Sequence, residues 1–318
     1  MKNTLKTEIK FILLAFCTFK RPNMLEKCLE FISKLKLPEN IRTEILVIDN
    51  DESASAKDVV EKYRNNLPIP INYFIEEKRG LSNARNRLIS EAVNLGASHI
   101  AMFDDDILLP ENWLINYVNY YNNNENAVIV TAASYSKFTE EPPKYISKND
   151  LFKCHTTKKT GSIRNDAASG NVFFPTTLIT ELNLNFNSEY VFMGGEDGRF
   201  FGEASLKGAT IVWCNDCFNW ELNGTDKINI KWIIRRSYYN GYSAAQRKMK
   251  NKNNFSRLFY GFKQLICLSF NLIGVPLSLL TGMVNFVNML GFSAKSFGRL
   301  TGALKNSSLN YYQNVYGN

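Results

Sequence analysis

The sequence predicts an α/β fold in which flanking helices cover a mostly parallel sheet and a helical tail follows. Short apolar runs alternate with segments of helical period through the first half of the chain. This alternation is typical of βαβ units, which build parallel sheets. From Lys227 onward there are 13 Lys or Arg and no Asp or Glu, and residues 264–294 carry no charge at all. This last part is therefore expected to form a separate, membrane-associated tail.

Apolar runs of strand length recur at regular intervals before the tail. The runs expected to form strands are 11–16, 44–48, 71–75, 100–103, 127–132 and 168–174, and a longer strand-like run covers 210–221. Residues 134–166 are polar and show no clear period, so we expect a long loop over the site there.

Helices are expected between these strands. Pro22 suits the first turn of a helix whose apolar side chains, from Leu25 to Leu35, recur at helical spacing. The other expected helices cover residues 53–64, 81–95, 110–121 and 196–207.

The run Ile100–Phe103 ends on three consecutive carboxylates, Asp104 to Asp106. Three adjacent like charges are costly unless a positive charge lies among them. Carboxylate oxygens suit Mg²⁺ or Mn²⁺, which proteins often hold with one or two carboxylates plus substrate phosphates. The strand ending at Asp49 would reach the same edge of a parallel sheet, where such sheets bind ligands. A solvated acidic turn is the alternative interpretation.

A second acidic motif is Gly194-Gly195-Glu196-Asp197, which precedes an expected helix. Acidic side chains in the first turn of a helix are stabilised by its dipole, so N-terminal capping and catalysis are both open for this pair. The chain has only two histidines, so acid–base chemistry is expected to rely on carboxylates.

Charge divides the chain into an acidic body and a basic tail. With 13 of the 38 basic residues in the tail, residues 1–226 hold 25 basic and 30 acidic side chains. Such asymmetry favours an anionic partner for the tail. No secretory signal is recognised at the start, so reduced cysteines are expected, and Cys214-x-x-Cys217 alone is a weak metal or redox signal.

Six short motifs occur in a fixed order between residues 9 and 250. They are Thr18-Phe19-Lys20-Arg21-Pro22, Val47-Ile48-Asp49-Asn50, Gly80-Leu81-Ser82-x-Ala84-Arg85-Asn86, Phe103-Asp104-Asp105-Asp106, Gly170-Asn171 and Gly194-Gly195-Glu196-Asp197. Together they resemble the family 2 glycosyltransferases, whose Rossmann-like nucleotide-sugar-binding fold is called GT-A. Residues 213–221 and 231–236 resemble a subgroup of bacterial exopolysaccharide glycosyltransferases of the succinoglycan glucosyltransferase type.

The resemblance implies a nucleotide-sugar site at the ends of the first strands. Thr18 and Asp49 would contact the base, and a buried carboxylate that accepts the uracil imide N–H would explain a preference for UDP-sugars. Arg21, Arg79 and Arg85 would lie in the same donor site, although Arg85 could instead be a helix-surface residue.

The resemblance also implies a divalent metal, Mn²⁺ or Mg²⁺, which would bridge the diphosphate. Asp104 would bind the ribose and Asp106 the metal, and Asp105 belongs to the same donor site. These roles are open by one position, so Asp104 is a second candidate metal ligand. Family members often carry a further histidine ligand, and here that neighbourhood offers Glu221 instead.

Asp197 would be the general base that takes the proton from an acceptor hydroxyl, with Glu196 positioning it or capping the helix. One base opposite the leaving group implies a single displacement with inversion. Processive synthases of the family carry a Gln-x-x-Arg-Trp motif for the diphosphate. Here Arg235 and Arg236, beside Trp232, would serve instead, which favours transfer of a single sugar.

The predicted organisation is a catalytic domain over 1–226, a basic amphipathic helical segment over 227–262 and an apolar membrane-associated tail over 263–318. The uncharged run is longer than the roughly 20 residues that cross a bilayer, but basic residues flank both of its ends. Since such flanks disfavour a single crossing, we favour a hairpin or an interfacial helix pair bent near Pro276. A single crossing and a buried helix pair remain open.

We therefore expect an inverting, metal-dependent glycosyltransferase at the cytoplasmic face of the cell membrane. It would move one sugar from a UDP-sugar to a polyprenyl-diphosphate-linked saccharide during synthesis of exopolysaccharide, capsule or O-antigen. The alternatives are a nucleotidyltransferase, although residues 16–22 are not a glycine- and lysine-rich phosphate loop, and a non-catalytic membrane adaptor. No nucleic-acid partner is expected, because the basic residues lie beside the apolar run.

Overall fold

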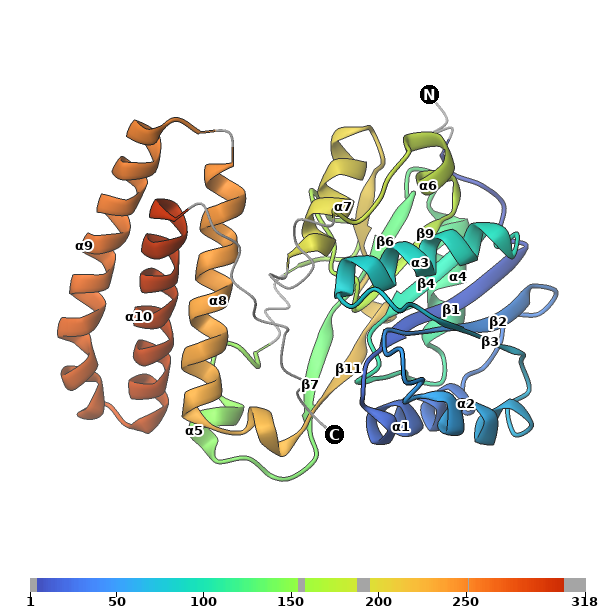
Figure 1. Ribbon diagram of the computed structural model, residues 1–318, viewed down its shortest axis with the longest axis horizontal. Coiled ribbons are helices and arrows are strands. Elements are labelled where there is room, and N and C mark those ends of the chain that lie inside the picture. The colour runs from blue at the N-terminus through green and yellow to red at the C-terminus, as the bar shows by residue number, and fades with distance from the viewer. Residues whose placement is uncertain (1–4, 154–157, 188–194, 251, 306–318) are drawn as a thin grey trace.

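An eight-stranded sheet forms the centre of the α/β body, and three long helices of the C-terminal part stand beside it (Figure 1). The computed structural model describes residues 5–153, 158–187, 195–250 and 252–305.

The main sheet has the strand order β3-β2-β1-β4-β9-β6-β10-β8. Its strands are β1 (Phe11–Thr18), β2 (Arg42–Asp49), β3 (Ile71–Ile75), β4 (His99–Phe103), β6 (Ile129–Thr131), β8 (Ile163–Arg164), β9 (Asn171–Pro175) and β10 (Ile211–Trp213). The first four strands are mutually parallel, as are β6 and β10, whereas β9 runs antiparallel to both β4 and β6 and β8 antiparallel to β10. The predicted mostly parallel sheet is therefore confirmed.

Helices cover both faces of this sheet, which explains why strands such as β1 are apolar along their length. One face packs against α1 (Pro22–Ile32), α2 (Lys57–Arg64) and α4 (Trp113–Asn123), and the other against α3 (Leu81–Asn94), α6 (Thr177–Leu182) and α7 (Glu196–Leu206). Each face has its own core of buried apolar side chains. The two cores hold the carboxyl ends of β1, β2 and β4 at one edge of the sheet.

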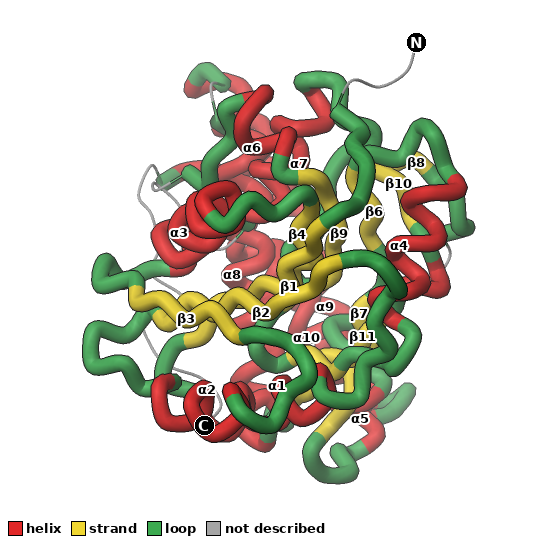
Figure 2. Tube along the Cα trace, turned by 90° about the vertical axis from the view of Figure 1, so that its right-hand side faces the viewer, coloured by secondary structure: helices red, strands yellow, loops and turns green. Residues whose placement is uncertain are grey.

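A second, three-stranded sheet was not predicted. In it β11 (Asn219–Asn223) pairs with β7 (Ser134–Phe138) on one side and with β5 (Ile107–Leu108) on the other. Figure 2 shows β7 and β11 side by side, apart from the main sheet. The expected loop over 134–166 is thus wrong in part, because it contains β7, α5 (Lys144–Ser147) and β8.

The expected strand over 210–221 is also wrong, because it is split in two. A 3₁₀ turn over Asn215–Cys217 separates β10 in the main sheet from β11 in the second sheet. Asn and Asp favour such turns because their side chains bond to nearby backbone. The split carries β11 beside β5, which directly follows the Asp104–Asp106 stretch.

The C-terminal part is a three-helix unit of α8 (Ile230–Met249), α9 (Asn254–Leu279) and α10 (Met283–Leu304), with α10 between the other two (Figure 1). The backbones of α8 and α10 approach so closely that a Cβ on Gly298 would overlap the carbonyl oxygen of Tyr238. Small residues permit this kind of helix contact.

The chain folds back a few residues after Pro276. Pro276 lies inside α9, and the chain reverses after it, at Gly282, whose φ of 106° favours glycine. Because α9 begins at Asn254, it also crosses the predicted boundary between residues 262 and 263.

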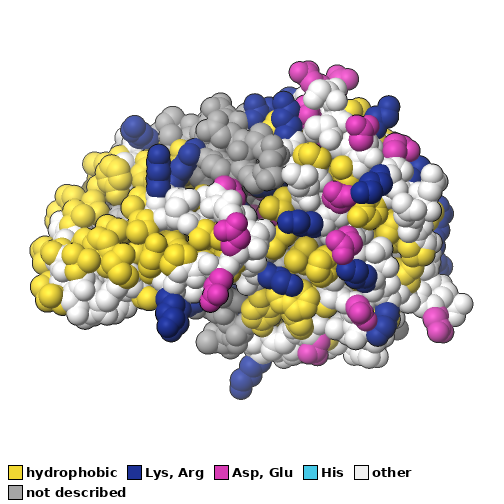
Figure 3. All heavy atoms as spheres, turned by 90° about the horizontal axis from the view of Figure 1, so that it is seen from below, with side chains coloured by type: hydrophobic (Ala, Val, Ile, Leu, Met, Phe, Trp, Pro, Cys, Tyr) yellow, Lys and Arg dark blue, Asp and Glu magenta, His cyan; other side chains and the backbone are white. Residues whose placement is uncertain are grey.

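Within the described residues, α9 is the one helix that is long and apolar enough to span a membrane by length and composition, with a mean hydropathy of 1.4. Only 11% of its most apolar window is buried, so α9 is not the core helix of a soluble bundle. Apolar side chains gather at the end of the molecule that α9 and α10 form, on the left of Figure 3.

Candidate active site

The carboxyl ends of the parallel strands bring the predicted donor-site residues to one edge. Thr18 and Asp49 end β1 and β2 and are paired in register, and Asp104 follows the last residue of the adjacent β4. This arrangement confirms that the acidic strand ends meet at one edge of the sheet, as the sequence predicts.

Asp105 is turned into the protein and is only 4% exposed. It accepts a 2.8 Å hydrogen bond from the Thr18 hydroxyl and a 3.0 Å bond from the Arg21 guanidinium. Burial raises the pKa of Asp105, and Arg21 opposes this shift. In this arrangement Asp105 anchors the loop after β1 to the end of β4.

Asp106 faces the second sheet. Its carboxylate lies 3.6 Å from Arg21 and 3.2 Å from the ammonium of Lys227, which also donates a 2.9 Å bond to Glu221. Burial alone would raise the pKa of Asp106, but Lys227 and Arg21 outweigh burial and lower it. Lys227 was missed in the sequence, because no motif or periodicity distinguishes it from the other basic residues of the tail.

Arg85 joins the end of β4 to the start of α7. It lies 3.1 Å from Asp104 and forms a second ion pair with Glu196, and both members of that second pair are buried. The interpretation of Arg85 as a helix-surface residue is therefore wrong. Its position could not be read from the sequence, because the partner at residue 196 is distant along the chain.

Asp197 lies in the first turn of α7 next to the loop that leads into β9. Its carboxylate accepts backbone N–H bonds from Gly198 at 2.7 Å and from Ser169 at 3.4 Å. The next residue of that loop, Gly170, lies against Asp104, because a Cβ on it would be 3.1 Å from Asp104 Oδ2. Asp197 and Asp104 are thus brought to the same side of the site.

Two features position the start of α7. Gly195 has a φ of 84°, which favours glycine, and a Cβ there would overlap the guanidinium of Arg247 from α8. Arg247 is a further residue that sequence reasoning missed, and it brings the three-helix unit against the start of α7. Gly194, the first glycine of the predicted motif, lies outside the described residues.

Asp49 is fully buried and already bonded within the protein. It accepts bonds of 2.8 Å from both the Tyr73 hydroxyl and the Ala56 amide, and one of 3.2 Å from the Asp51 amide. Burial raises the pKa of Asp49, and these donors oppose the shift. The bonds hold the loop after β2, and the predicted contact with the base stays a prediction.

The remaining predicted basic residues lie on the loop before α3 and on α8. The guanidinium of Arg79 stacks on Phe19 of the loop after β1, at 4.7 Å from the ring centroid. Arg235 and Arg236 lie on α8, where Arg235 is 5.9 Å from the Tyr239 ring. The diphosphate role of Arg235 and Arg236 stays a prediction.

The site is negative overall. Six carboxylates meet three cations: Asp104, Asp105, Asp106, Glu196, Asp197 and Glu221 against Arg21, Arg85 and Lys227. Burial raises the pKa of both Asp104 and Glu196 to about 6 against the opposing effect of Arg85. Because 46% of the Asp104 side chain is exposed, solvent weakens its shift relative to that of the buried Glu196. Among these described side chains the carboxylates outnumber the cations even when Arg247, beside Gly195, is added, so an added cation would favour the binding of an anionic ligand.

Asp106 and Glu221 are suited to bind a divalent cation whose remaining ligands come from the substrate and water. Asp106 Oδ2 and Glu221 Oε1 face one point, because both lie within hydrogen-bond distance of the same Lys227 nitrogen. Among the described residues, no group of three or more His, Cys, Asp or Glu is arranged to hold a metal ion. A cation at this point would therefore take further ligands from water and phosphate oxygens, as Mg²⁺ often does.

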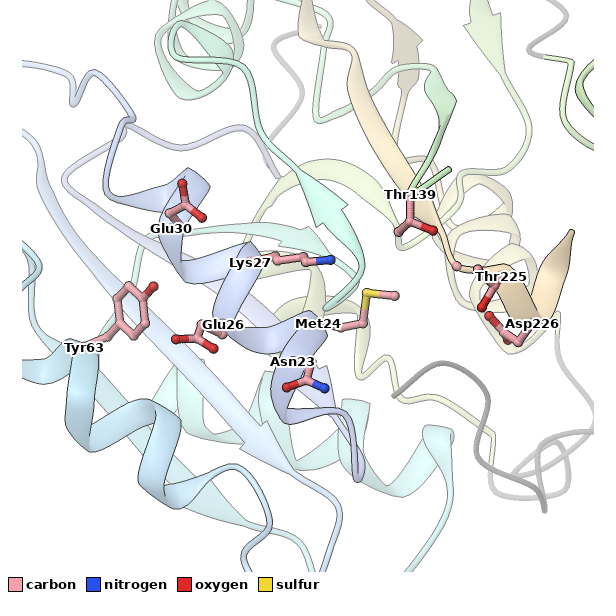
Figure 4. A pocket seen from close by; sticks show the side chains of 10 residues that line it. Asn23, Met24, Glu26, Lys27, Glu30, Tyr63, Thr139, Thr225 and Asp226 are labelled. Atoms are coloured by element: carbon pink, nitrogen blue, oxygen red, sulfur yellow. The ribbon is translucent and has the colours of Figure 1, made fainter. Parts of the chain in front are cut away.

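A cavity of about 580 Å³ lies beside this cluster and not over it. Figure 4 shows Met24 and Lys27 of α1 facing Thr139, Thr225 and Asp226 across it. The cavity borders the turn that carries Lys227, but none of the carboxylates predicted to bind the donor line it. We therefore do not assign the donor site to this cavity.

Comparison with known proteins identifies the class. Residues 14–178, just over half of the chain, match Glycosyl transferase family 2. The chain therefore belongs to glycosyltransferase family 2 and has the GT-A fold of glycosyltransferases. This membership favours a glycosyltransferase over a nucleotidyltransferase or a membrane adaptor. The match ends before Glu196, Asp197 and Glu221.

The individual proteins that this chain resembles share less than 25% sequence identity with it. The succinoglycan biosynthesis protein ExoM of Rhizobium meliloti is 24% identical over 225 residues, which are 71% of each chain. The mannosyltransferase PcManGT from Pyrobaculum calidifontis, in complex with GDP-Man and Mn²⁺, has a TM-score of 0.64 at 13% identity, over 93% of this chain and 88% of that one. S. aureus TarS 1-349 in complex with UDP-GlcNAc has a TM-score of 0.55 at 14% identity, over 92% and 91%. Structural similarity at these identities supports the fold alone.

Proposed function

We propose that this glycosyltransferase moves one sugar, with inversion, from a UDP-sugar to a polyprenyl-diphosphate-linked saccharide during cell-surface polysaccharide synthesis. The observation that carries the proposal is the link through Arg85, which joins Asp104 at the end of β4 to Glu196 at the start of α7. That link holds Asp104, the expected ribose contact at the end of β4, near Asp197, a candidate base for the acceptor.

The residues divide the chemistry between two sides of the site. Asp106 and Glu221 would hold the divalent cation, Mn²⁺ or Mg²⁺, and that cation would offset negative charge on the departing diphosphate. Asp104, half-exposed after the end of β4, would bind the ribose.

On the other side, Asp197 would take the proton from the acceptor hydroxyl. Its carboxylate is held by two backbone N–H groups, which orient an oxygen without neutralising it. Glu196, buried and paired with Arg85, would fix the first turn of α7 and so position Asp197. A single base on the side opposite the leaving group is consistent with one displacement and an inverted product.

The donor and the pathway are supported by comparison. ExoM is named for succinoglycan biosynthesis, and TarS has been solved with UDP-GlcNAc, whereas PcManGT has been solved with GDP-Man. We favour UDP because Asp49, which ends β2 beside Thr18, is the carboxylate expected to accept the uracil imide N–H. A GDP-sugar is the alternative outcome of the test below.

A membrane-bound acceptor is supported by α9, whose buried side chains are small or polar and whose exposed side chains are apolar. The side chains that α9 buries are small or polar: Gly261, Gln264 and Ser278. Its outer face is apolar, with Phe262 59% and Phe270 70% exposed. Water would disfavour this arrangement and lipid would favour it. The basic residues of the helix hairpin, such as Lys263 and Arg299, lie toward its open end, away from the uncharged turn at Gly282. They would add attraction to an anionic leaflet, here the cytoplasmic face of the cell membrane.

Nucleotide release tests the activity. The full chain would be incubated with Mn²⁺, a lipid-linked saccharide fraction and a panel of UDP-, GDP- and dTDP-sugars. The proposal expects release of UDP from one donor, dependent on acceptor, and an inverted anomeric configuration in the product. Release of GDP alone would overturn the uridine assignment, and a retained configuration would overturn the role of Asp197.

Vesicle flotation tests the membrane role separately. The wild type is expected to float with vesicles that contain anionic lipid, and the double variant Phe262→Glu/Phe270→Glu is expected to remain in solution. Leu206→Glu is the matched control, because Leu206 is 91% exposed on the catalytic body. Equal flotation of the double variant and the control would show that α9 is not the contact.

A further inference from the structure

Lys227 lies where a divalent cation would be expected. Its ammonium donates bonds of 3.2 Å to Asp106 and 2.9 Å to Glu221. The two carboxylates come together because Glu221 of β11 pairs with Ile107 of β5, the residue after Asp106. Lys227 is 9% exposed at the end of the 3₁₀ turn Thr225–Lys227. Because the residue is buried, its ammonium stays at the two carboxylates unless the whole side chain changes conformation.

The second cation at Asp106 is held differently. Arg21 lies 3.6 Å from Asp106 but is bonded at 3.0 Å to Asp105, and it precedes the first residue of α1. The guanidinium is a rigid fork, whereas lysine carries a point charge on a flexible four-carbon stem. Of the two cations at Asp106, Lys227 is thus the one that can move.

Two cations cannot share this point. A divalent ion bound to both Asp106 and Glu221 would lie within a few ångströms of an unmoved ammonium, and like charges at that range repel strongly. Either Lys227 leaves the two carboxylates when the metal enters, or the metal stays out.

Building on the proposed function, we propose that Lys227 competes with the divalent cation for Asp106 and Glu221 and so sets the metal affinity of the donor site. When the metal displaces it, the ammonium turns to the donor diphosphate, the nearest anion that would then be available. Lys227 is in this sense a positioning residue: the affinity for metal is kept low until the diphosphate provides a second partner for the lysine.

Direct Mn²⁺ binding tests this proposal without any turnover. The free Mn²⁺ signal in electron paramagnetic resonance would be titrated for the wild type, Lys227→Met, Lys227→Arg and the exposed control Lys231→Met, all without nucleotide. Removing the competing charge is expected to lower the Mn²⁺ Kd of Lys227→Met by about tenfold or more. Lys231→Met should resemble the wild type, and Lys227→Arg, which keeps the charge on a more rigid group, should bind Mn²⁺ no more tightly than the wild type. An unchanged or higher Kd for Lys227→Met would overturn the competition.

A second measurement covers the case in which Lys227→Met does not fold. In a crystal of the wild type with Mn²⁺ and UDP, the proposal expects the anomalous Mn²⁺ peak beside Asp106 and Glu221, with the Lys227 ammonium moved to the diphosphate. A peak there with Lys227 still bonded to both carboxylates, or a peak elsewhere, would contradict it. If the wild type binds neither UDP nor Mn²⁺, the proposed function itself fails. If it binds both and Lys227→Met binds Mn²⁺ no tighter, only the inference about Lys227 fails.

Discussion

Arg85 of α3 and Glu196 of α7 form an ion pair whose side chains are only 6% and 3% exposed. They are 111 positions apart in the sequence, and the same guanidinium also lies 3.1 Å from Asp104. One buried cation therefore holds together the two acidic motifs of the site, the end of β4 and the first turn of α7.

Breaking this pair should be costly. Arg85→Met leaves Glu196 as a buried carboxylate without its partner, and we expect a loss of about 3–5 kcal/mol in the free energy of unfolding. The double variant Arg85→Met/Glu196→Gln should recover part of that loss, because the buried charge of Glu196 is gone and Asp104, which also loses Arg85, is 46% exposed. Urea unfolding measures both.

Arg87→Met is the matched control for this experiment. Arg87 lies on the same helix and pairs with Glu91 at its surface, with its own side chain 41% exposed, so about 0–1 kcal/mol is expected. An equally small loss for Arg85→Met would contradict the structural role of the buried pair.

The general base is tested by Asp197→Asn. We expect the transfer rate to fall by about 10²–10⁴-fold, because a positioned base contributes that much, whereas UDP affinity should change little. Single-turnover transfer and UDP titration would be measured on the same preparation. A variant that transfers at the wild-type rate would show that the acceptor proton goes elsewhere.

The sequence predicts the strand ends that form the centre of the site better than the long-range contacts that link them to other elements. The bounds of β3 and the acidic end of β4 follow from apolar runs with polar ends, which are local signals. Arg85 lies in a recognisable motif, yet its partner Glu196 could not be foreseen, because nothing local marks a long-range ion pair.

The second sheet was hidden from the sequence for a different reason. β5 has two residues, and β7 lies in a polar segment with no alternating pattern, since its side chains are mostly half-buried. β11 then joins them through backbone pairing. Glu221 contacts Lys227 near Asp106 only because of this strand pairing, and the hydrophobic periodicity of the sequence does not predict the pairing.

His99 should make stability depend on pH. Its ring is buried, stacks on Phe173 and packs edge-on against Tyr121, and burial, with a smaller effect of Lys6, lowers the pKa of His99 to about 3. Between that value and the ordinary value of about 6.5, the unfolded chain binds one proton more than the native chain. Stability therefore falls as pH falls through this window, by up to about 1.4 kcal/mol per pH unit.

Replacing the ring tests this contribution. His99→Phe keeps the stacking and removes the titration, so its unfolding free energy should fall less steeply with pH than that of the wild type between about pH 6.5 and 4.5. Identical slopes for the two proteins in urea unfolding would exclude His99 as the cause.

The close contact of α8 with α10 depends on Gly298. In Gly298→Leu the side chain would meet the Tyr238 carbonyl, so we expect the helices to separate and limited proteolysis to cut the C-terminal unit at least about tenfold faster, in line with a loss above 1.4 kcal/mol. Ser269→Leu, at an exposed position of α9, introduces the same side chain and should be cut like the wild type. Equal cleavage of both variants would contradict the packing role of Gly298.

The most direct test of a nucleotide-sugar site is a calorimetric titration of the full chain with UDP, with and without Mn²⁺. We expect UDP binding that Mn²⁺ strengthens, and the loss of that metal effect in Asp106→Asn, because Asp106 is one of the two carboxylates that face the cation position. Asp58→Asn, on the exposed face of α2, should titrate like the wild type. Binding of UDP by Asp106→Asn with the full metal effect would contradict the account, and absence of UDP binding by the wild type under every condition would overturn the uridine assignment.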